Sequence, residues 1–143
     1  MKKLLALFSI TTITILTISA VRQPNYTILK QQTDLEESKK RGSEIYNGFC
    51  IQCHLPNGKG IPGTFPPLAG SDWLKNKRTE SIHSVKFGLK GVIQVNGQTY
   101  QQTMPNPGLE NDEIADVMNY IMNNWGNSQQ KIVTTKEVAS IKK

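Results

Sequence analysis

The pattern of apolar and polar positions predicts a mostly helical protein. Three stretches repeat apolar residues at the spacing of one helical face, and they cover residues 39–53, 79–89 and 111–125. The last stretch is the clearest, because Asn111 is a favourable cap and Gly126 a common helix stop. Its apolar face consists of Ile114, Val117, Met118, Ile121, Met122 and Trp125.

A short hairpin is expected at residues 92–100. Apolar and polar residues alternate there around Asn96-Gly97, which is a strong signal for a two-residue turn. A two-stranded hairpin is marginal by itself, so it must rest on another part of the molecule. The predicted fold class is therefore all-α, with long irregular loops and one small β-hairpin. Such loops need a central body to pack against.

Both ends of the chain differ from this patterned middle. Residues 1–21 begin with two lysines and continue as an apolar stretch, as in a secretory signal or an N-terminal membrane anchor. Ala20 offers a cleavage position, and either alternative places the rest of the chain outside the cytoplasm. Residues 22–38 are polar and aperiodic, which predicts a linker. Residues 128–143 are expected to form a polar tail, with room for a short helix.

Composition and charge restrict the partners. Of the 143 residues, 37% are hydrophobic and 7% aromatic, which provides for one modest core. The net charge is +6, but residues 39–127 hold nine basic against seven acidic side chains, so the excess lies largely outside the patterned region. Because no basic run carries interleaved aromatic residues, we expect no nucleic-acid partner. An acidic protein or an anionic membrane surface fits this charge better.

Two cysteines carry the decisive chemistry. Residues 50–54 read Cys-Ile-Gln-Cys-His, and Cys-x-x-Cys-His is the attachment signature of a c-type haem. Two thiols at this spacing can add to the two vinyl groups of one porphyrin, and His54 can then ligate the iron. A thioredoxin-like pair would lie between a strand and a helix, and a zinc site would need ligands beyond His83. We therefore predict one covalent haem c attached to Cys50 and Cys53.

The flanking sequence resembles class I c-type cytochromes, in particular bacterial mono-haem cytochrome c domains, over residues 39–126. Five features occur in the family's order, namely Gly42 with Tyr46, the haem pentapeptide, Pro66-x-Leu68-x-Gly70, Met104-Pro105 and Tyr120. The resemblance implies a cytochrome c fold wrapped around haem in a domain at residues 39–127, and an electron carrier rather than an enzyme. The shorter stretch between Gly70 and Met104, with its added hairpin, departs from the mitochondrial type.

His54 and Met104 are the predicted axial ligands of the haem iron. The resemblance implies that the other ring N–H of His54 donates to the Pro66 carbonyl, which would orient the imidazole. Met104 lies in a loop stiffened by prolines, and such a loop holds a weak thioether ligand with little loss of entropy. Imidazole with thioether predicts a higher reduction potential than two imidazoles. The remaining candidates are expected to be core or surface residues, and they are Met118, Met122 and His83.

Further residues have a functional and a structural alternative. The indole of Trp73 either donates to a haem propionate or simply packs. Tyr46 and Tyr120 are expected to pack edge to face where two helices cross closely at Gly42. Six cations either surround the haem edge or form ordinary surface, and they are Lys59, Lys75, Lys77, Arg78, Lys86 and Lys90.

These predictions point to one-electron transfer in a periplasmic or membrane-surface respiratory chain. We expect redox proteins as donor and acceptor, possible membrane anchoring and no small-molecule substrate, since no catalytic constellation stands out. An alternative is a haem subunit of a periplasmic oxidoreductase or terminal oxidase complex. A haem sensor with an open sixth site and a thiol–disulfide module are further alternatives.

Overall fold

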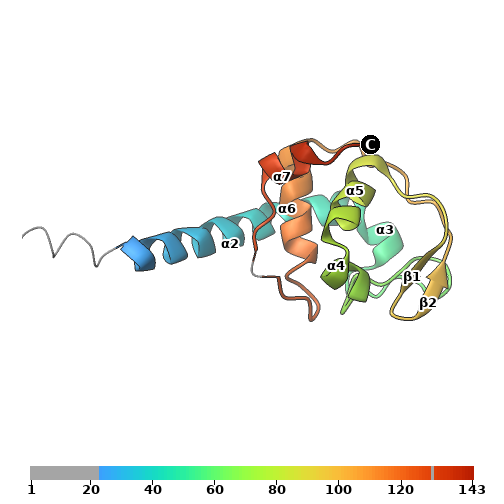
Figure 1. The fold of residues 1–143 in the computed structure, drawn as a ribbon. Helices are drawn as coiled ribbons and strands as arrows, with labels where there is room; N and C mark the ends of the chain where they lie inside the picture. Colours follow the sequence, from blue (N-terminus) through green and yellow to red (C-terminus); the bar gives the residue numbers. More distant parts are fainter. Residues whose placement is uncertain (1–22, 130) are drawn as a thin grey trace, which may run out of the picture. The chain divides into compact units, whose positions relative to one another are not determined.

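The computed structural model describes residues 23–129 and 131–143. Its elements are α2 (Gln23–Phe49), α3 (Ile51–His54), α4 (Asp72–Asn76), α5 (Arg78–Phe87), β1 (Ile93–Val95), β2 (Gln98–Tyr100), α6 (Asn111–Ile121) and α7 (Thr135–Ser140) (Figure 1). The predicted helical class and hairpin are confirmed. Strands β1 and β2 pair antiparallel around Asn96-Gly97, and both turn residues have positive φ, as a tight hairpin turn requires.

The predicted linker is helical where the structure describes it. The chain divides into two compact units, residues 1–34 and 35–143, and helix α2 begins at Gln23. Residues 25–41 contain neither Gly nor Pro, so nothing in this polar stretch opposes a helix. Ser38 is buried and its hydroxyl donates to Asp116 Oδ1 at 2.6 Å. The packed part of α2 therefore includes Ser38, one residue before the predicted start of the domain at residue 39.

The N-terminal signal or anchor predicted for residues 1–21 lies outside the described residues. Among the helices that the structure describes, none combines the length and the apolar character needed to cross a bilayer.

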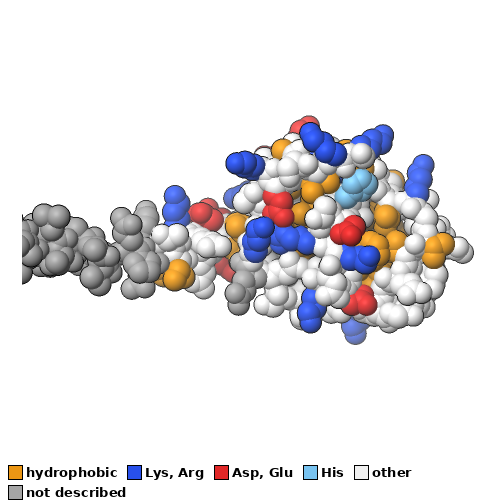
Figure 2. All heavy atoms as spheres, in the orientation of Figure 1, with side chains coloured by type: hydrophobic (Ala, Val, Ile, Leu, Met, Phe, Trp, Pro, Cys, Tyr) orange, Lys and Arg blue, Asp and Glu red, His pale blue; other side chains and the backbone are white. Residues whose placement is uncertain are grey.

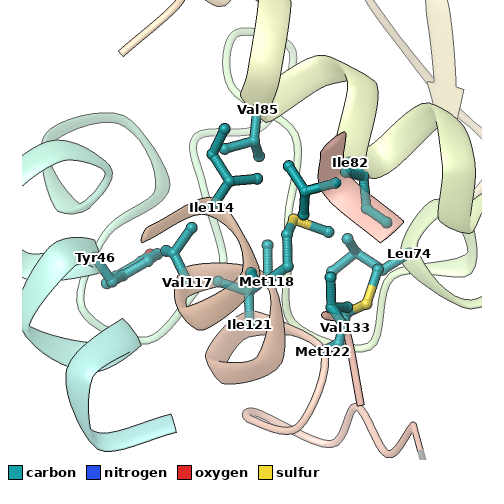
Figure 3. Packing of buried hydrophobic residues seen from close by; sticks show 12 residues of the cluster. Tyr46, Leu74, Ile82, Val85, Ile114, Val117, Met118, Ile121, Met122 and Val133 are labelled. Carbon is teal, nitrogen blue, oxygen red and sulfur yellow. The ribbon is translucent and has the colours of Figure 1, made fainter. Parts of the chain in front are cut away.

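The hydrophobic core surrounds α6 (Figure 3), and the predicted apolar residues from Ile114 to Met122 are buried. Helix α6 ends at Ile121, so Trp125 lies beyond the helix, with a φ of 50°, and is not on its face as predicted. Met118 and Met122 are 0% and 1% exposed, so both are core residues as expected. Burial of each such side chain contributes about 1.5–3 kcal/mol to folding. The residues that α2, α4 and α5 add to this core are Tyr46, Leu74, Ile82 and Val85.

Helix α2 crosses α6 at very short range. A Cβ at Gly42 would overlap the backbone carbonyl of Asp116, so only glycine allows this approach. The rings of Tyr46 and Tyr120 are 5.5 Å apart with planes at 49°, which is tilted rather than the predicted edge-to-face geometry. Trp125 packs beside this pair, edge-on to Tyr120 and 5.0 Å from Tyr46.

The C-terminal segment, residues 131–143, packs on the domain and contains the short helix for which the sequence left room. Its short helix α7 lies beside α6 (Figure 1). Val133 and Val138 are 2% and 0% exposed and join the core. The buried amide of Asn119 donates to the Val133 carbonyl and accepts from the Val133 N–H, at 2.9 and 2.7 Å. Two valines and one internal amide thus anchor a segment that is otherwise polar.

Helix α5 is tied to the same segment near both its ends. Arg78 donates two hydrogen bonds to the Glu137 carboxylate, at 2.8 and 2.9 Å, and one at 3.2 Å to the Lys131 carbonyl. Lys86 donates to the carbonyls of Val138 and Ile141. Two of the six cations considered for the haem edge therefore hold the C-terminal segment instead.

Candidate haem site

One helical turn brings the three residues of the haem signature together. The Cys50 N–H donates to the Tyr46 carbonyl at 2.9 Å, and the His54 N–H donates to the Cys50 carbonyl at 3.0 Å, so helical bonding continues from α2 into α3. Leu55 ends the turn with a φ of 63°. The Tyr46 hydroxyl donates to the Leu55 carbonyl at 2.6 Å and fixes this exit. The motif is thereby attached directly to the core.

Two cavities meet at His54 and Met104. Both are lined by these two residues together with Pro66, Leu89 and Ile93. Cys50 lines the first cavity and Cys53 the second. The first cavity continues along apolar side chains of four further elements, and these include Leu74, Val85, Val95, Val117 and Ile121. The donor set and the apolar walls fit a covalently attached haem.

His54 has the hydrogen bond of an oriented metal ligand. Its Nδ1 lies 3.0 Å from the Pro66 carbonyl oxygen, which can only accept, so Nδ1 carries the proton. Burial lowers the pKa of His54, while the bond to Pro66 acts in the opposite direction. The neutral imidazole therefore leaves Nε2 with a free lone pair.

The two thiols do not resemble a disulfide-exchange pair. Burial, with a smaller contribution from Cys53, raises the pKa of Cys50 to about 11. A reactive thiol of an exchange protein needs a lowered pKa and a positive environment. The raised pKa of Cys50 thus disfavours the thiol–disulfide alternative. Across the described ranges, no group of three His, Cys, Asp or Glu residues is placed to hold a metal ion.

The other candidates for the sixth ligand lie away from the cavities. Met118 and Met122 are core residues and line neither cavity. His83 also lines neither cavity, and its ring packs 5.0 Å from Phe87. Met104 is half-buried between the two cavities, which leaves it as the candidate that the structure brings to His54.

Trp73 lines the first cavity from helix α4 and is half-buried. Lys77 places its Nζ 5.0 Å from the centre of the indole ring. No described residue accepts a hydrogen bond from the indole N–H, so this donor stays available to a ligand. The propionate contact remains a prediction.

Four cations of the expected ring are exposed and form no ion pair with any residue in the described ranges, namely Lys59, Lys75, Lys77 and Lys90. On the face shown in Figure 2, basic side chains are spread around the domain, with acidic side chains and hydrophobic patches among them. The charge is therefore dispersed on this face and forms no single basic patch.

Sequence reasoning missed two supports of the cavity wall. Asn127 donates to the carbonyls of Leu68 and Ile121 and accepts from the Ser71 N–H, so it joins the wall to the end of α6. Leu89 pairs with Met104 through the backbone. Neither residue type signals such a role, because the partners lie far away in the sequence.

These features together define a c-type cytochrome. They are a helical turn that carries both thiols, an oriented imidazole, and apolar cavities that are also lined by a methionine. The cytochrome c family model matches residues 39–125, and the chain belongs to this family. Its relatives include cytochrome c-552 of Thermus thermophilus, which is 38% identical over 110 residues, or 71% of this chain and 83% of that protein.

Subunits of larger assemblies are similar as well. The gluconate 2-dehydrogenase cytochrome c subunit of Pantoea cypripedii is 33% identical over 75% of this chain and 25% of its own length. The alcohol dehydrogenase (quinone) cytochrome c subunit of Gluconobacter oxydans (strain 621H) is 29% identical over 71% of this chain and 22% of its own length. The predicted family, fold and covalent haem c are confirmed, and membership implies an electron carrier. The match ends at residue 125, before the C-terminal segment.

Proposed function

We propose that this protein is a mono-haem electron carrier whose haem is attached to Cys50 and Cys53 and ligated by His54 and Met104. One observation carries the proposal: His54 and Met104 line both cavities, while each cavity has one of the two cysteines. When bound, the haem iron supplies one-electron exchange between the ferrous and ferric states. With His54 and Met104 both holding the iron, the protein would leave no position on the metal for a substrate.

The surrounding residues orient the ligands and exclude water. The Pro66 carbonyl fixes the imidazole of His54 through Nδ1. The apolar side chains of α5 and α6 keep the site at low dielectric, which raises the cost of a charge change and helps set the potential. The free indole N–H of Trp73 is the donor that we assign to a propionate.

We infer that the protein acts on the outer side of the cytoplasmic membrane, in the periplasm or bound to the membrane surface. The lysine pair and apolar stretch of residues 1–21 support export by a cleaved signal or an uncleaved anchor. Its donor and acceptor would be redox proteins of a respiratory chain. The mass of the mature protein decides between the two forms of the N-terminus.

A second candidate is a haem subunit of a periplasmic oxidoreductase or oxidase complex. The similarity to dehydrogenase cytochrome subunits favours it. The chain corresponds to 25% or less of the length of those two subunits, so their substrates do not transfer with the match. Copurification with a stoichiometric larger enzyme would support this candidate, and a free monomer of high yield would contradict it.

The test of the main proposal uses full-length protein produced with haem-maturation machinery. Intact mass and a pyridine haemochrome spectrum should show one haem, and neither cysteine should react with an alkylating agent. Colourless protein with two free thiols would overturn the proposal. The axial assignment is tested by Met104→Ala, which should remove the red-edge sulfur-to-iron charge-transfer band and let the reduced protein bind carbon monoxide. Met122→Leu is the matched control, since it changes a core methionine and should retain the band.

A further inference from the structure

The loop of Met104 is fastened to the domain through the backbone of Met104 itself. The Met104 N–H donates to the Leu89 carbonyl, and the Leu89 N–H donates to the Met104 carbonyl, each at 2.9 Å. In the part of the chain described, residues 101–109 make no other backbone-to-backbone hydrogen bond. Residues paired in this way direct their side chains to the same face. Leu89 and Met104 accordingly line both cavities together.

Leu89, the partner of Met104 in this bridge, is connected to a helix that is anchored in the core. Leu89 follows α5 after a single residue, and α5 is held in the core by Ile82 and Val85, which are 0% and 8% exposed. The Met104 loop is therefore bonded to the end of α5, a helix whose position is fixed by core packing. Without the bridge, the prolines would restrict the loop but would not fix its position against α5.

Gly88 leaves the space that this bridge needs. Its φ is +81°, and a Cβ there would lie 2.8 Å from the Met104 carbonyl oxygen, 3.0 Å from the Asn106 nitrogen and 3.3 Å from the Pro105 carbonyl carbon. All three are backbone atoms, which cannot turn aside as a flexible side chain would. A methyl group at this position must push the Met104 loop away from Leu89.

We propose that Gly88 and Leu89 are positioning residues for the sixth iron ligand, because they hold the backbone of Met104 where its thioether can bind the haem iron. The proposal rests on the axial role of Met104 given above. A thioether is a weak neutral ligand, so the fraction of molecules in which it is bound depends on how narrowly the protein restricts it. Release of the bridge would open the sixth position to external ligands.

The test compares Gly88→Ala with Gly108→Ala in the haem-loaded protein. Gly108 lies in the same loop with a φ of +76°, but a Cβ there meets nothing within 4 Å. Both variants place an alanine at a positive φ, which is unfavourable, but only the Cβ of Gly88→Ala would overlap the backbone of the Met104 loop. Gly88→Ala should lose most of the charge-transfer band. Its reduced form should bind carbon monoxide about tenfold more tightly than Gly108→Ala, since apparent affinity follows the fraction of molecules with a free sixth position.

Equal spectra and equal carbon monoxide affinities in the two variants would overturn the inference. A second measurement serves if Gly88→Ala does not fold. In the wild-type protein the amides of Leu89 and Met104 should exchange hydrogen more slowly than the exposed amide of Gln102, and equal rates would also overturn it. The Met104→Ala variant separates the two claims. If the band survives there, the axial assignment fails; if it disappears there while Gly88→Ala matches Gly108→Ala, only the positioning role fails.

Discussion

The helix crossing and the C-terminal segment both pack on α6, but through different contacts. At the crossing, Gly42 brings two backbones together and the rings of Tyr46 and Tyr120 fill the adjacent space. The C-terminal segment is held by polar side chains that reach backbone groups, chiefly from Asn119 and Arg78. The crossing depends mainly on close backbone packing, with Ser38 and Arg41 also bonded to the Asp116 carboxylate. The segment depends on several separate hydrogen bonds, so single changes there should cost less.

The largest effect is expected at the crossing, from Gly42→Ala. The added methyl meets the carbonyl of Asp116 and the Cβ of Tyr120, which cannot rotate away. Overpacking of this kind costs about 3 kcal/mol. Denaturant unfolding of the haem-loaded variant, followed by far-UV circular dichroism, measures the loss.

Gly48→Ala is the matched control for this change. It lies on the same helix, and its added Cβ meets nothing within 4 Å. Alanine in a helix is favoured over glycine by about 0.5–1 kcal/mol, so this variant should be slightly more stable than wild type. Equal stability of the two variants would show that the close approach is not the sensitive feature.

A smaller loss of stability is expected from Asn119→Ala, which removes hydrogen bonds that hold the C-terminal segment. The change leaves the N–H and carbonyl of Val133 without their partners in a place that is 2% exposed. An unsatisfied buried backbone group costs about 1–3 kcal/mol, and relaxation of the segment limits the total to about 2 kcal/mol. The amide of Val133 should also lose its protection from hydrogen exchange.

The control for this prediction is Asn124→Ala. The Asn124 side chain makes no hydrogen bond to any residue in the described ranges, so the stability of the variant should stay near that of wild type. If Asn119→Ala behaves in the same way, the segment is not anchored by this amide.

The same contrast explains what the sequence could and could not predict. The haem signature, Gly42 and Tyr46 signal their roles through residue type and local spacing. The structure places the signature on one helical turn and Gly42 at the helix crossing, as expected, while Tyr46 packs on Tyr120 in a tilted rather than an edge-to-face geometry. The packing of the C-terminal segment could not be predicted, because Val133 and Val138 are its only buried hydrophobic residues among those described, and two residues are too few for a periodic pattern. Its stability comes from partners about 14 to 59 residues away, such as Asn119 and Arg78, and hydrophobic periodicity contains no information on these contacts.

The position of the Met104 loop was unpredictable for a related reason. A Met-Pro pair in a loop identifies the candidate ligand, but the backbone bridge to Leu89 has no sequence signature. Gly88 could be expected to end a helix. Its second role follows only from the distance between its backbone and the loop.

The smallest effect, and the one that depends on pH, is expected from Glu137→Gln. Hydrogen bonds from Arg78 lower the pKa of Glu137, with desolvation opposing and nearby positive charge assisting. Because the folded pKa lies below the unfolded value of about 4.3, the pair stabilises the protein above that pH and stops doing so as pH falls through the folded pKa. At pH 7 the variant should be less stable by about 0.5–1 kcal/mol, a modest value because the pair is partly exposed.

The difference between wild type and Glu137→Gln should therefore shrink steadily once the pH falls below about 5. Denaturant unfolding at a series of pH values measures it, and Glu80→Gln provides the control, since Glu80 has no ion pair with the described residues. A gap that stayed constant down to strongly acid pH would mean that the charge of Glu137 contributes nothing. The C-terminal segment would then be held by its neutral hydrogen bonds and two buried valines alone. In that case charge would act only at the helix crossing, where Arg41 of α2 pairs with Asp116 of α6 at 2.6 Å.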